Sequence, residues 1–347
     1  MNEIIEQRKR KWTDFLNLES NTNRLICVYC SEGLPKPVPK YWELKEERIE
    51  CAYQTFQKRM EHAQWLQDDS VPYLDMLTGT EIFAEALGAP VHRPKDNLPC
   101  AMPLIKSMEE LYKIKIPRME DTNLYILFEM AHKLRERAGK DVPLSLPDVQ
   151  TPMDIAALLW EKSDFYATMF EEPEPILELA EKIKLFMFDF FDKWFAEFGK
   201  DFIAHCPPYY MPYGITMSED EVGIVNSEMF RDFFAQELND FGERYGAVGI
   251  HCCANANHQW ENFSHVKNLR LMNLARTQDD FEKSVPVFKD TCAMWPSIIS
   301  DENISLEPKL PNKTFDPKAH IAFDRWVKTK EEAVWTLAYY RELFEKT

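Results

Sequence analysis

The sequence predicts an α/β fold: a (β/α)8 TIM barrel with extra N-terminal helices. The chain has 347 residues, of which 45% are hydrophobic, so it can bury a large core. Short apolar runs alternate with longer amphipathic stretches along its whole length, which is typical of a parallel sheet covered by helices. Seven or eight such units favour closure into a barrel over an open doubly wound sheet, which remains the alternative.

The predicted strands are short apolar runs, several of them rich in Val and Ile. They lie at residues 24–30, 71–77, 142–148, 201–206, 247–253, 269–274 and 285–295, with a weaker eighth candidate at 303–306. In a parallel barrel the working residues lie at the carboxyl ends of such strands.

The predicted helices carry apolar residues at helical spacing between these runs. They cover residues 45–66, 122–138, 152–170, 173–198, 226–245 and 329–344. Two of them open near a proline, which the first turn of a helix tolerates, and Asn226-Ser227 is a suitable N-cap pair.

Composition and charge narrow the class of protein. Lys plus Arg total 41 and Asp plus Glu total 58, so the formal net charge is −17. Such a charge disfavours nonspecific binding to nucleic acid or to anionic membrane. No apolar run has the ~20 residues that span a bilayer, and no signal peptide is evident. The eight cysteines are too sparse for a disulfide scaffold. We therefore expect a cytoplasmic protein with reduced thiols, available as metal ligands or nucleophiles.

The densest group of chemically active residues is Gly249-Ile-His-Cys-Cys-Ala-Asn255, at the end of a predicted strand. Alternate strand residues share a face, so His251 and Cys253 point the same way. An imidazole and a thiolate are zinc ligands, and a catalytic zinc takes three protein ligands. His258 and Cys292 are candidates for the third position. The plainer interpretation is a hydrogen-bonded histidine beside packed thiols.

Other polar residues also follow strand-like runs. Asp75, Asp148 and Gln150 can line the mouth of a barrel and bind a polar substrate, or they can cap helices. The loop 205–213 is aromatic and rich in proline, and with Tyr210 it can form a pocket wall or pack between helices. Asp220 belongs to an acidic run that can open a helix or face the pocket. Cys27 and Cys30 are better explained by core packing than by metal binding.

Nucleotide and serine-hydrolase chemistry lack support. The sequence contains no G-x-G-x-x-G, no Walker loop and no G-x-S-x-G elbow.

Four stretches between Ser70 and Ile299 resemble the uroporphyrinogen decarboxylase superfamily, and their order and spacing match as well. They are VPYLD with the later AEALG (residues 71–75 and 84–88), PLSLPDVQTPMDIAA (143–157), MSEDEVGIVNSEMF (217–230) and GIHCCAN (249–255), the last similar to the family's I-H-x-C-G-N. The resemblance implies a single barrel domain over residues 1–347. Residues 1–70 would form an N-terminal extension with the first strand and helix, and residues 71–347 the remainder of the barrel.

The resemblance leaves two chemistries open. Decarboxylases of the superfamily act on a tetrapyrrole without cofactor, through an Arg-rich N-terminal loop, an Asp, a Tyr and a late His. Asp75 matches the catalytic Asp. Leu158 stands where the Tyr is expected, His320 has a different context, and residues 34–42 lack the arginine motif. A polycarboxylate substrate needs such cations.

The other branch resembles zinc-dependent methyltransferases that move a methyl group between a corrinoid protein and a thiol. His251 and Cys253 match its first two zinc ligands. Its last cysteine lies nearer the C-terminus, so Cys292, the final cysteine here, is an imperfect match for the third ligand, and Ala254 replaces a glycine. A zinc-bound thiol is held as thiolate and becomes a methyl acceptor.

We therefore expect a zinc-dependent methyltransferase with zinc on His251, Cys253 and Cys292, Asp75 in a catalytic role, and Asp148, Gln150, Tyr210 and Asp220 in the substrate pocket. Its partners would be a corrinoid protein and a small thiol or methylated substrate. The rival hypotheses are a cofactor-free uroporphyrinogen decarboxylase and a noncatalytic barrel that binds a corrinoid or porphyrin.

Overall fold

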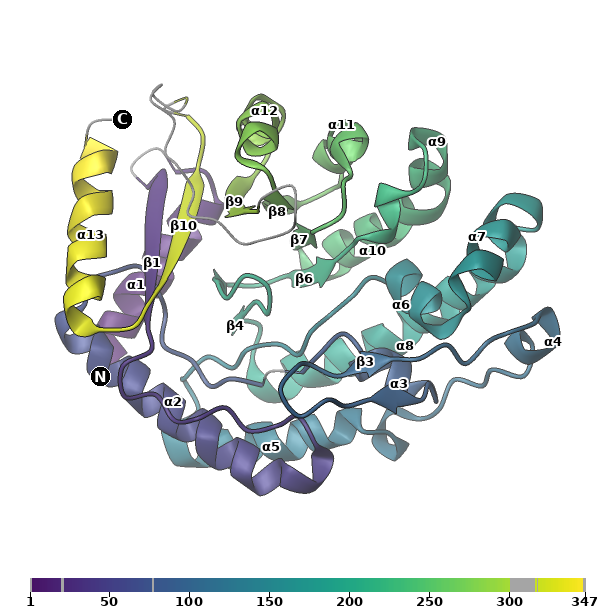
Figure 1. The fold of residues 1–347 in the computed structure, drawn as a ribbon, viewed down its shortest axis with the longest axis horizontal. Coiled ribbons are helices and arrows are strands. Elements are labelled where there is room, and N and C mark those ends of the chain that lie inside the picture. The colour runs from purple at the N-terminus through teal and green to yellow at the C-terminus, as the bar shows by residue number, and fades with distance from the viewer. Residues whose placement is uncertain (1, 20–21, 77, 300–315, 317, 346–347) are drawn as a thin grey trace.

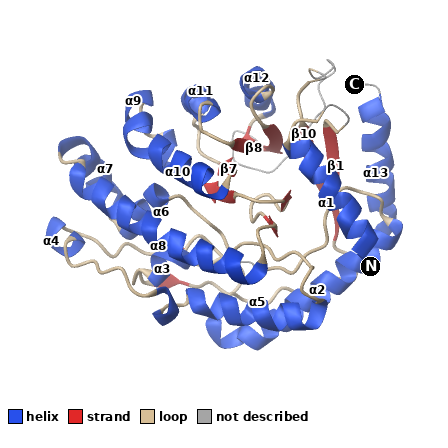
Figure 2. Cartoon of the chain, turned by 180° about the vertical axis from the view of Figure 1, so that it is seen from behind, coloured by secondary structure: helices blue, strands red, loops and turns tan. Residues whose placement is uncertain are grey.

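The structure is a computed structural model that describes residues 2–19, 22–76, 78–299, 316 and 318–345. Its centre is a parallel six-stranded sheet with helices outside it (Figures 1 and 2). The strand order is β1-β10-β9-β8-β7-β6, with β1 at Arg24–Cys30, β10 at Ile321–Val327, β9 at Ala293–Ile298, β8 at Leu269–Arg276, β7 at Val248–Cys252 and β6 at Ile215–Ser218.

The remaining side of the barrel is made by short bridges instead of long strands. Residues 143–146 pair in parallel with Leu74 on one side and with Ile203 on the other, and Gln150 pairs with Ser218 of β6. The Asp69 N–H donates to Ile26 O of β1 at 2.9 Å. The α/β barrel predicted from the sequence is therefore confirmed, with one irregular side. Two small antiparallel pairs are added to it, β2 (Val91–His92) with β3 (Cys100–Ala101) and β4 (Phe202–Ile203) with β5 (Tyr210–Met211).

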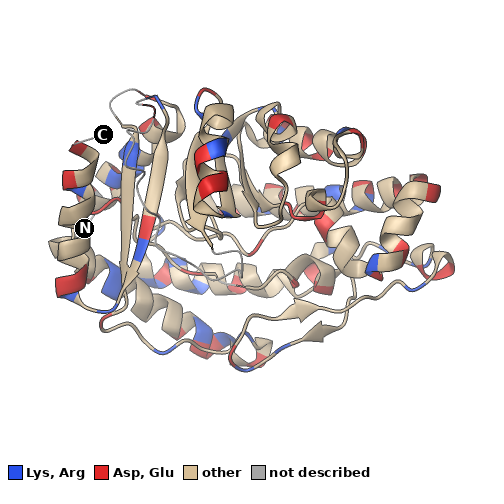
Figure 3. Cartoon of the chain, turned by 45° about the horizontal axis from the view of Figure 1, so that its top comes forward, with Lys and Arg blue, Asp and Glu red and all other residues tan. Residues whose placement is uncertain are grey.

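The helices cover the outside of the barrel, with α10, α11 and α12 along one side and α2, α5 and α8 along another (Figure 1). Their bounds are α1 Asn2–Leu16, α2 Lys45–Trp65, α3 Ile82–Ala86, α4 Met108–Leu111, α5 Leu124–Ala138, α6 Pro152–Leu159, α7 Lys162–Glu171, α8 Glu174–Phe198, α9 Ser227–Met229, α10 Ala235–Tyr245, α11 Trp260–Ser264, α12 Gln278–Phe288 and α13 Lys330–Glu345. A π-helical turn at Phe230–Phe234 joins α9 to α10. Acidic and basic residues alternate along these helices (Figure 3).

A stack of aromatic side chains fills part of the interior. Trp12 of α1 lies 5.7 Å from Trp295 of β9 and 5.8 Å from Tyr209, measured between ring centroids, and all three are buried. The indole N–H of Trp12 donates to Asp69 O at 2.8 Å. The stack thus fixes the N-terminal helix to the barrel, because large aromatic surfaces are removed from water there.

The predicted strands 24–30, 247–253 and 269–274 are confirmed, and several other elements need correction. The described parts of the predicted strands 71–77 and 142–148 form isolated bridges at Leu74, Leu144 and Ser145 only, and 201–206 contains the two-residue strand β4. The predicted helix 226–245 is interrupted by the π-helical turn at Phe230–Phe234. The predicted strand 285–295 is wrong in its first part: residues up to Phe288 finish α12, and β9 starts at Ala293. The predicted helix 152–170 is two helices, α6 and α7. Strands β6 and β10 were not predicted as strands. The candidate strand 303–306 lies outside the described residues.

No helix in the described part of the chain combines the length and the apolar character needed to cross a membrane.

Candidate metal centre

Three potential metal ligands meet at the carboxyl ends of β6 and β7. One ligand atom from each of Asp220, His251 and Cys253 lies within 4.8 Å of the other two. His251 and Cys252 end β7, and Asp220 follows β6 by two residues. The Glu219 N–H donates to His251 O at 2.9 Å, which extends the pairing of the two strands beyond β6. The parallel register therefore delivers the three side chains to one edge, as barrel geometry requires.

Asp220 is held in place by the backbone that follows β7. Its Oδ1 accepts from the N–H groups of Cys253 at 2.6 Å and Ala254 at 3.1 Å, and its Oδ2 lies 3.0 Å from Cys253 Sγ. The buried carboxylate of Asp154 in α6 accepts from the backbone N–H of Asp220 and Glu221, each at 3.0 Å. Both the backbone and the side-chain carboxylate of Asp220 are thus held in place by the protein itself.

Buried acids lie beneath the turn. Burial, together with the charge of Asp220, raises the pKa of Asp154 to about 7. Burial and the charge of Asp154 raise the pKa of Glu219, whose carboxylate accepts from Thr151 Oγ1 at 2.6 Å. Burial also raises the pKa of Glu237, which accepts from the Met153 N–H. These acids favour their neutral forms because the protein replaces water around them.

Asn273 of β8 orients the imidazole of His251. The Asn273 side-chain NH₂ donates to Trp295 O at 2.6 Å and to Ser297 Oγ at 3.0 Å, so its Oδ1 faces the ring. The Nδ1–H of His251 donates to that oxygen. The lone pair of Nε2 then remains for a metal ion, and this arrangement is common around metal-binding histidines.

The chemistry of the three ligands suits zinc. Zn²⁺ binds nitrogen, sulfur and oxygen donors at about 2.0–2.3 Å, so its ligand atoms lie about 3.3–3.8 Å apart in a tetrahedral site. The observed limit of 4.8 Å is compatible with that spacing after small side-chain movements. Cys253 is exposed, so a small molecule can reach the fourth position.

The charges of the group favour bound protons when no metal is present. Burial lowers the pKa of His251, but Cys206, Cys253 and Asp220 outweigh it and hold the pKa well above its usual range. The hydrogen bond from His251 lowers the pKa of Cys253, while burial and Asp220 raise it, and the net effect is upward. A metal ion would have to displace these protons.

Cys292 does not join this group. Cys292 is buried and comes just before β9. In the sheet register, His251 of β7 pairs with Asn273 of β8, and Asn273 pairs with Trp295 of β9. Trp295 comes three residues after Cys292. At about 3.3 Å per strand residue, Cys292 lies roughly 10 Å further toward the amino ends of the strands. Asp220, predicted as a pocket residue, lies beside His251 and Cys253, where Cys292 was expected. His258, the other candidate, has its Nε2 2.8 Å from Val225 O.

The other predicted site residues have varied surroundings. Asp148 and Gln150 are buried at the carboxyl edge, and Asp148 pairs with His205. Tyr210 lies elsewhere: its hydroxyl donates to Asp201, just before β4, and Lys9 of α1 sits over its ring at 5.5 Å. That position is at the amino ends of the strands, so Tyr210 fastens α1 to the barrel instead of lining the mouth.

Asp75 faces a cationic cavity. The cavity has a volume of about 180 Å³ and is lined by Lys40, Arg48 and Asp75 together with apolar side chains. A third cation, Arg59, lies 3.6 Å from Asp75 Oδ2. The sequence carried no sign of cations near Asp75, because Lys40 lies in a proline-rich loop and Arg48 and Arg59 lie in α2, and none of the three belongs to a recognisable motif.

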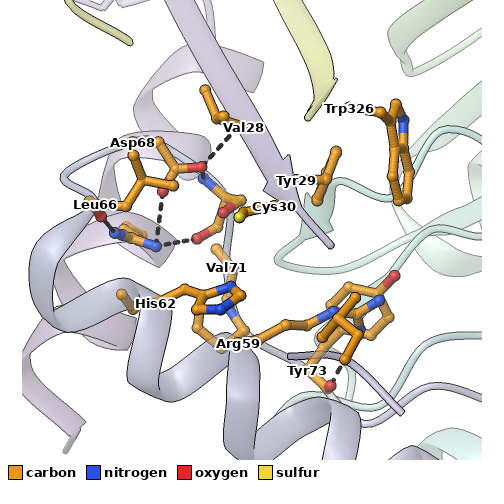
Figure 4. A pocket seen from close by; sticks show the side chains of 15 residues that line it. Val28, Tyr29, Cys30, Arg59, His62, Leu66, Asp68, Val71, Tyr73 and Trp326 are labelled. Atoms are coloured by element: carbon orange, nitrogen blue, oxygen red, sulfur yellow. Dashed lines mark hydrogen bonds and ion pairs between the residues drawn. The ribbon is translucent and has the colours of Figure 1, made fainter. Parts of the chain in front are cut away.

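A further cavity beside β1 has a structural role (Figure 4). Arg8 of α1 donates to Ser70 O and Leu66 O at 2.5 Å each and lies 3.1 Å from Asp68. Asp68 in turn accepts from the Val28 N–H at 2.8 Å. The polar groups on this wall are therefore occupied in fastening α1 to the barrel.

Sequence reasoning did not identify Asn273 or Asp154 as parts of the site. One signal was present for Asn273: it is an amide side chain flanked by Leu271, Met272, Leu274 and Ala275, and polar groups inside strands need partners. Asp154 resembles an ordinary residue in the first turn of a helix, so its contact with the turn at Asp220 could not be inferred.

The fold and the site together define an α/β barrel with a candidate metal centre at the carboxyl ends of its strands. Comparison with known proteins agrees with the fold. The pattern of the family described as uroporphyrinogen decarboxylase (URO-D) matches residues 68–294, well over half of the chain. The protein belongs to the uroporphyrinogen decarboxylase family.

Among solved structures, a methyltransferase from Methanosarcina mazei superposes with a TM-score of 0.65 and 14% sequence identity. The match covers 97% of this chain and 99% of that chain, so the two proteins share the barrel over nearly their whole lengths. A search of curated proteins found no match.

Proposed function

We propose that this protein is a zinc-dependent methyltransferase in which His251, Cys253 and Asp220 hold the metal and a small thiol accepts a methyl group from a methyl-corrinoid protein. The observation that carries the proposal is the meeting of these three ligand atoms within 4.8 Å at the carboxyl edge of the barrel. The fold shared with a protein named as a methyltransferase supports it. The corrinoid donor follows from the family resemblance of the His-x-Cys motif.

The residues around the centre have separate tasks under this proposal. Zinc, when bound, would hold the acceptor sulfur as a thiolate, which is the nucleophile for methyl transfer. Asn273 keeps the imidazole of His251 in one tautomer and one orientation. Asp154 and the N–H groups of Cys253 and Ala254 keep the Asp220 carboxylate facing the two other ligands.

Metal content per chain, measured on anaerobically purified protein, tests the assignment. We expect about one zinc in the wild type and loss of it in Cys253→Ser, because a hydroxyl is a poor substitute for a thiolate ligand. Asp220→Ala should weaken zinc binding by at least about tenfold. Cys292→Ser is the matched control and should retain the metal.

Two results would contradict this assignment. Loss of zinc in Cys292→Ser, with retention in Asp220→Ala, would return the third position to Cys292. A wild-type protein that takes up no zinc even when supplied with it would overturn the proposed function.

The cations around Asp75 favour a second candidate function, decarboxylation of a tetrapyrrole. Lys40, Arg48 and Arg59 are the kind of groups that bind carboxylates, and Asp75 matches the family's catalytic Asp. Incubation with uroporphyrinogen decides between the functions: we expect no decarboxylated product from the zinc-loaded protein. Product formed by the wild type and abolished in Asp75→Asn would establish this second function instead.

A further inference from the structure

A histidine–aspartate pair lies beside the candidate metal centre and is not part of it. His205 follows β4, and its Nε2 lies 3.2 Å from Asp148 Oδ2. The two residues belong to neighbouring segments of the barrel, because Ser145 pairs with Ile203. The Asp148 N–H donates to Thr78 Oγ1 at 2.9 Å, and Thr78 is buried. The backbone that carries the Asp148 carboxylate is therefore fixed.

Through the residue that follows His205, the pair lies close to one of the proposed metal ligands in space. Cys206, the residue after His205, has its Sγ 3.7 Å from His251 Nδ1. The His205 side chain is 16% exposed, so a small molecule can reach it. Within the described part of the chain, Asp148 is its one hydrogen-bonding or ionic partner, which leaves Nδ1 available. His205 thus has one nitrogen anchored and the other ready to exchange a proton.

The groups around His205 stabilise its protonated form. Burial lowers its pKa, but the charges of Asp148, Cys206 and Asp75 outweigh this effect and the net shift is upward. These three groups are all acidic, and they come from three separate segments of the barrel. A proton gained at Nδ1 would therefore be balanced by a nearby carboxylate, as in other histidines that act as bases.

We infer that His205, oriented by Asp148, is the proton acceptor for the thiol substrate; this inference rests on the proposed function. The S–H bond of the thiol breaks, its proton forms a new N–H bond at Nδ1 of His205, and the electron pair stays on sulfur as the thiolate. The Asp148 carboxylate, 3.2 Å from Nε2, balances the charge of the imidazolium. Histidine suits this task because its ordinary pKa lies near neutrality, so it can accept the proton and later release it to water.

Proton release on thiol binding tests the inference directly. Zinc-loaded protein is titrated with 2-mercaptoethanol at about pH 8, where an alkyl thiol is mostly protonated, by calorimetry in buffers of different ionisation enthalpy. We expect about zero protons released by the wild type and about one by His205→Gln, because the variant has no acceptor on the protein. Zinc content should be the same in both, which separates this role from a structural one.

The control variant is His132→Gln. His132 also pairs with a carboxylate, at 2.7 Å from Glu197, but it belongs to α5 and its partner to α8, both on the outside of the barrel. The His132→Gln variant should release about as many protons on thiol binding as the wild type does. In the metal-free protein, Asp148→Asn should lower the pKa of His205 measured by NMR, which tests the pairing itself.

The outcomes separate the two proposals. If wild type and His205→Gln bind the thiol with equal proton release, or if Asp148→Asn leaves the titration of His205 unchanged, the inference fails and the proposed function stands. If zinc-loaded wild type does not bind the thiol at all, the proposed function fails and the inference fails with it.

Discussion

Glu81 illustrates at the residue scale how burial makes stability depend on pH. Its side chain is almost fully buried, and Oε2 has no hydrogen-bond partner among the described residues. Burial, with Glu85 and Asp148 nearby, raises its pKa to about 7 even though Arg93 opposes the shift. An unfolded glutamate titrates near ~4.3, so the folded protein holds this proton more tightly than the unfolded chain does.

The contribution of protonated Glu81 to the free energy of unfolding is fully present below the pKa of an unfolded glutamate. It is lost as the pH rises through about 7, the pKa of Glu81 in the folded protein. Glu81→Gln cannot ionise. We therefore expect it to gain about 1–3 kcal/mol of unfolding free energy relative to wild type between pH 4 and pH 8. Urea denaturation at both pH values measures this. Glu109→Gln, an exposed position, should show no such change, and an equal pH dependence in wild type and Glu81→Gln would refute the prediction.

At the residue scale, the sequence predicted that His251 and Cys253 lie together, and their role as metal ligands stays a prediction. His-x-Cys at a strand end correctly placed His251 and Cys253 together. Which residue lies beside this pair depends on strand register, which the sequence does not state. His258 and Cys292 were the candidates for a third ligand, and Asp220, predicted as a pocket residue, is the side chain that lies there. Residue type alone could not distinguish a buried cysteine at the amino end of β9 from one at the carboxyl edge.

At the scale of the element, Gly249 shows how closely β7 packs against the aromatic interior. A Cβ at Gly249 would lie 2.0 Å from the hydroxyl oxygen of Tyr209 and 3.1 Å from Thr216 Cγ2. The Tyr209 ring cannot move away easily, because it packs against Trp12 and Trp295. Overpacking of this kind costs about 1–3 kcal/mol.

We expect Gly249→Ala to lower the free energy of unfolding by about that amount. Adding Tyr209→Phe removes the hydroxyl oxygen and leaves the Tyr209 Cζ position as the nearest ring atom, 3.3 Å from the new Cβ. The double variant should therefore recover most of the loss relative to Tyr209→Phe alone. Chemical denaturation of the four proteins measures the coupling, and equal effects of Gly249→Ala in both backgrounds would show that the contact is unimportant.

Elements were predicted well where one period dominates and poorly where tertiary contacts override it. Residues 285–288 have the apolar character of a strand, yet they finish α12, whose start is capped by Thr277. The helix over 152–170 breaks at Trp160, which is extended and pairs with Ile105. β10 was missed because Asp324 interrupts its apolar pattern; that carboxylate accepts from the indole of Trp295 at 2.9 Å.

At the scale of the whole molecule, strand–helix alternation was sufficient to predict the barrel. Each strand pairs with neighbouring strands, and its apolar side chains must pack against the covering helices. The way the ring closes was not predictable. β1 pairs along its full length with β10, and the opposite side is joined by single bridges at Leu74, Ser145 and Gln150. Backbone bridges leave little trace in the hydrophobic pattern.

The pairing of β1 with β10 also has a consequence for synthesis. All seven residues of β1 find their partners in a strand that leaves the ribosome last among the strands described here. The edge of β1 that pairs with β10 therefore stays unpaired until residues 321–327 have been synthesised. Contacts between such distant segments slow folding, and open strand edges invite aggregation. We expect nascent chains that stop before residue 321 to depend on chaperones, and ring closure to be the late event that ends that dependence.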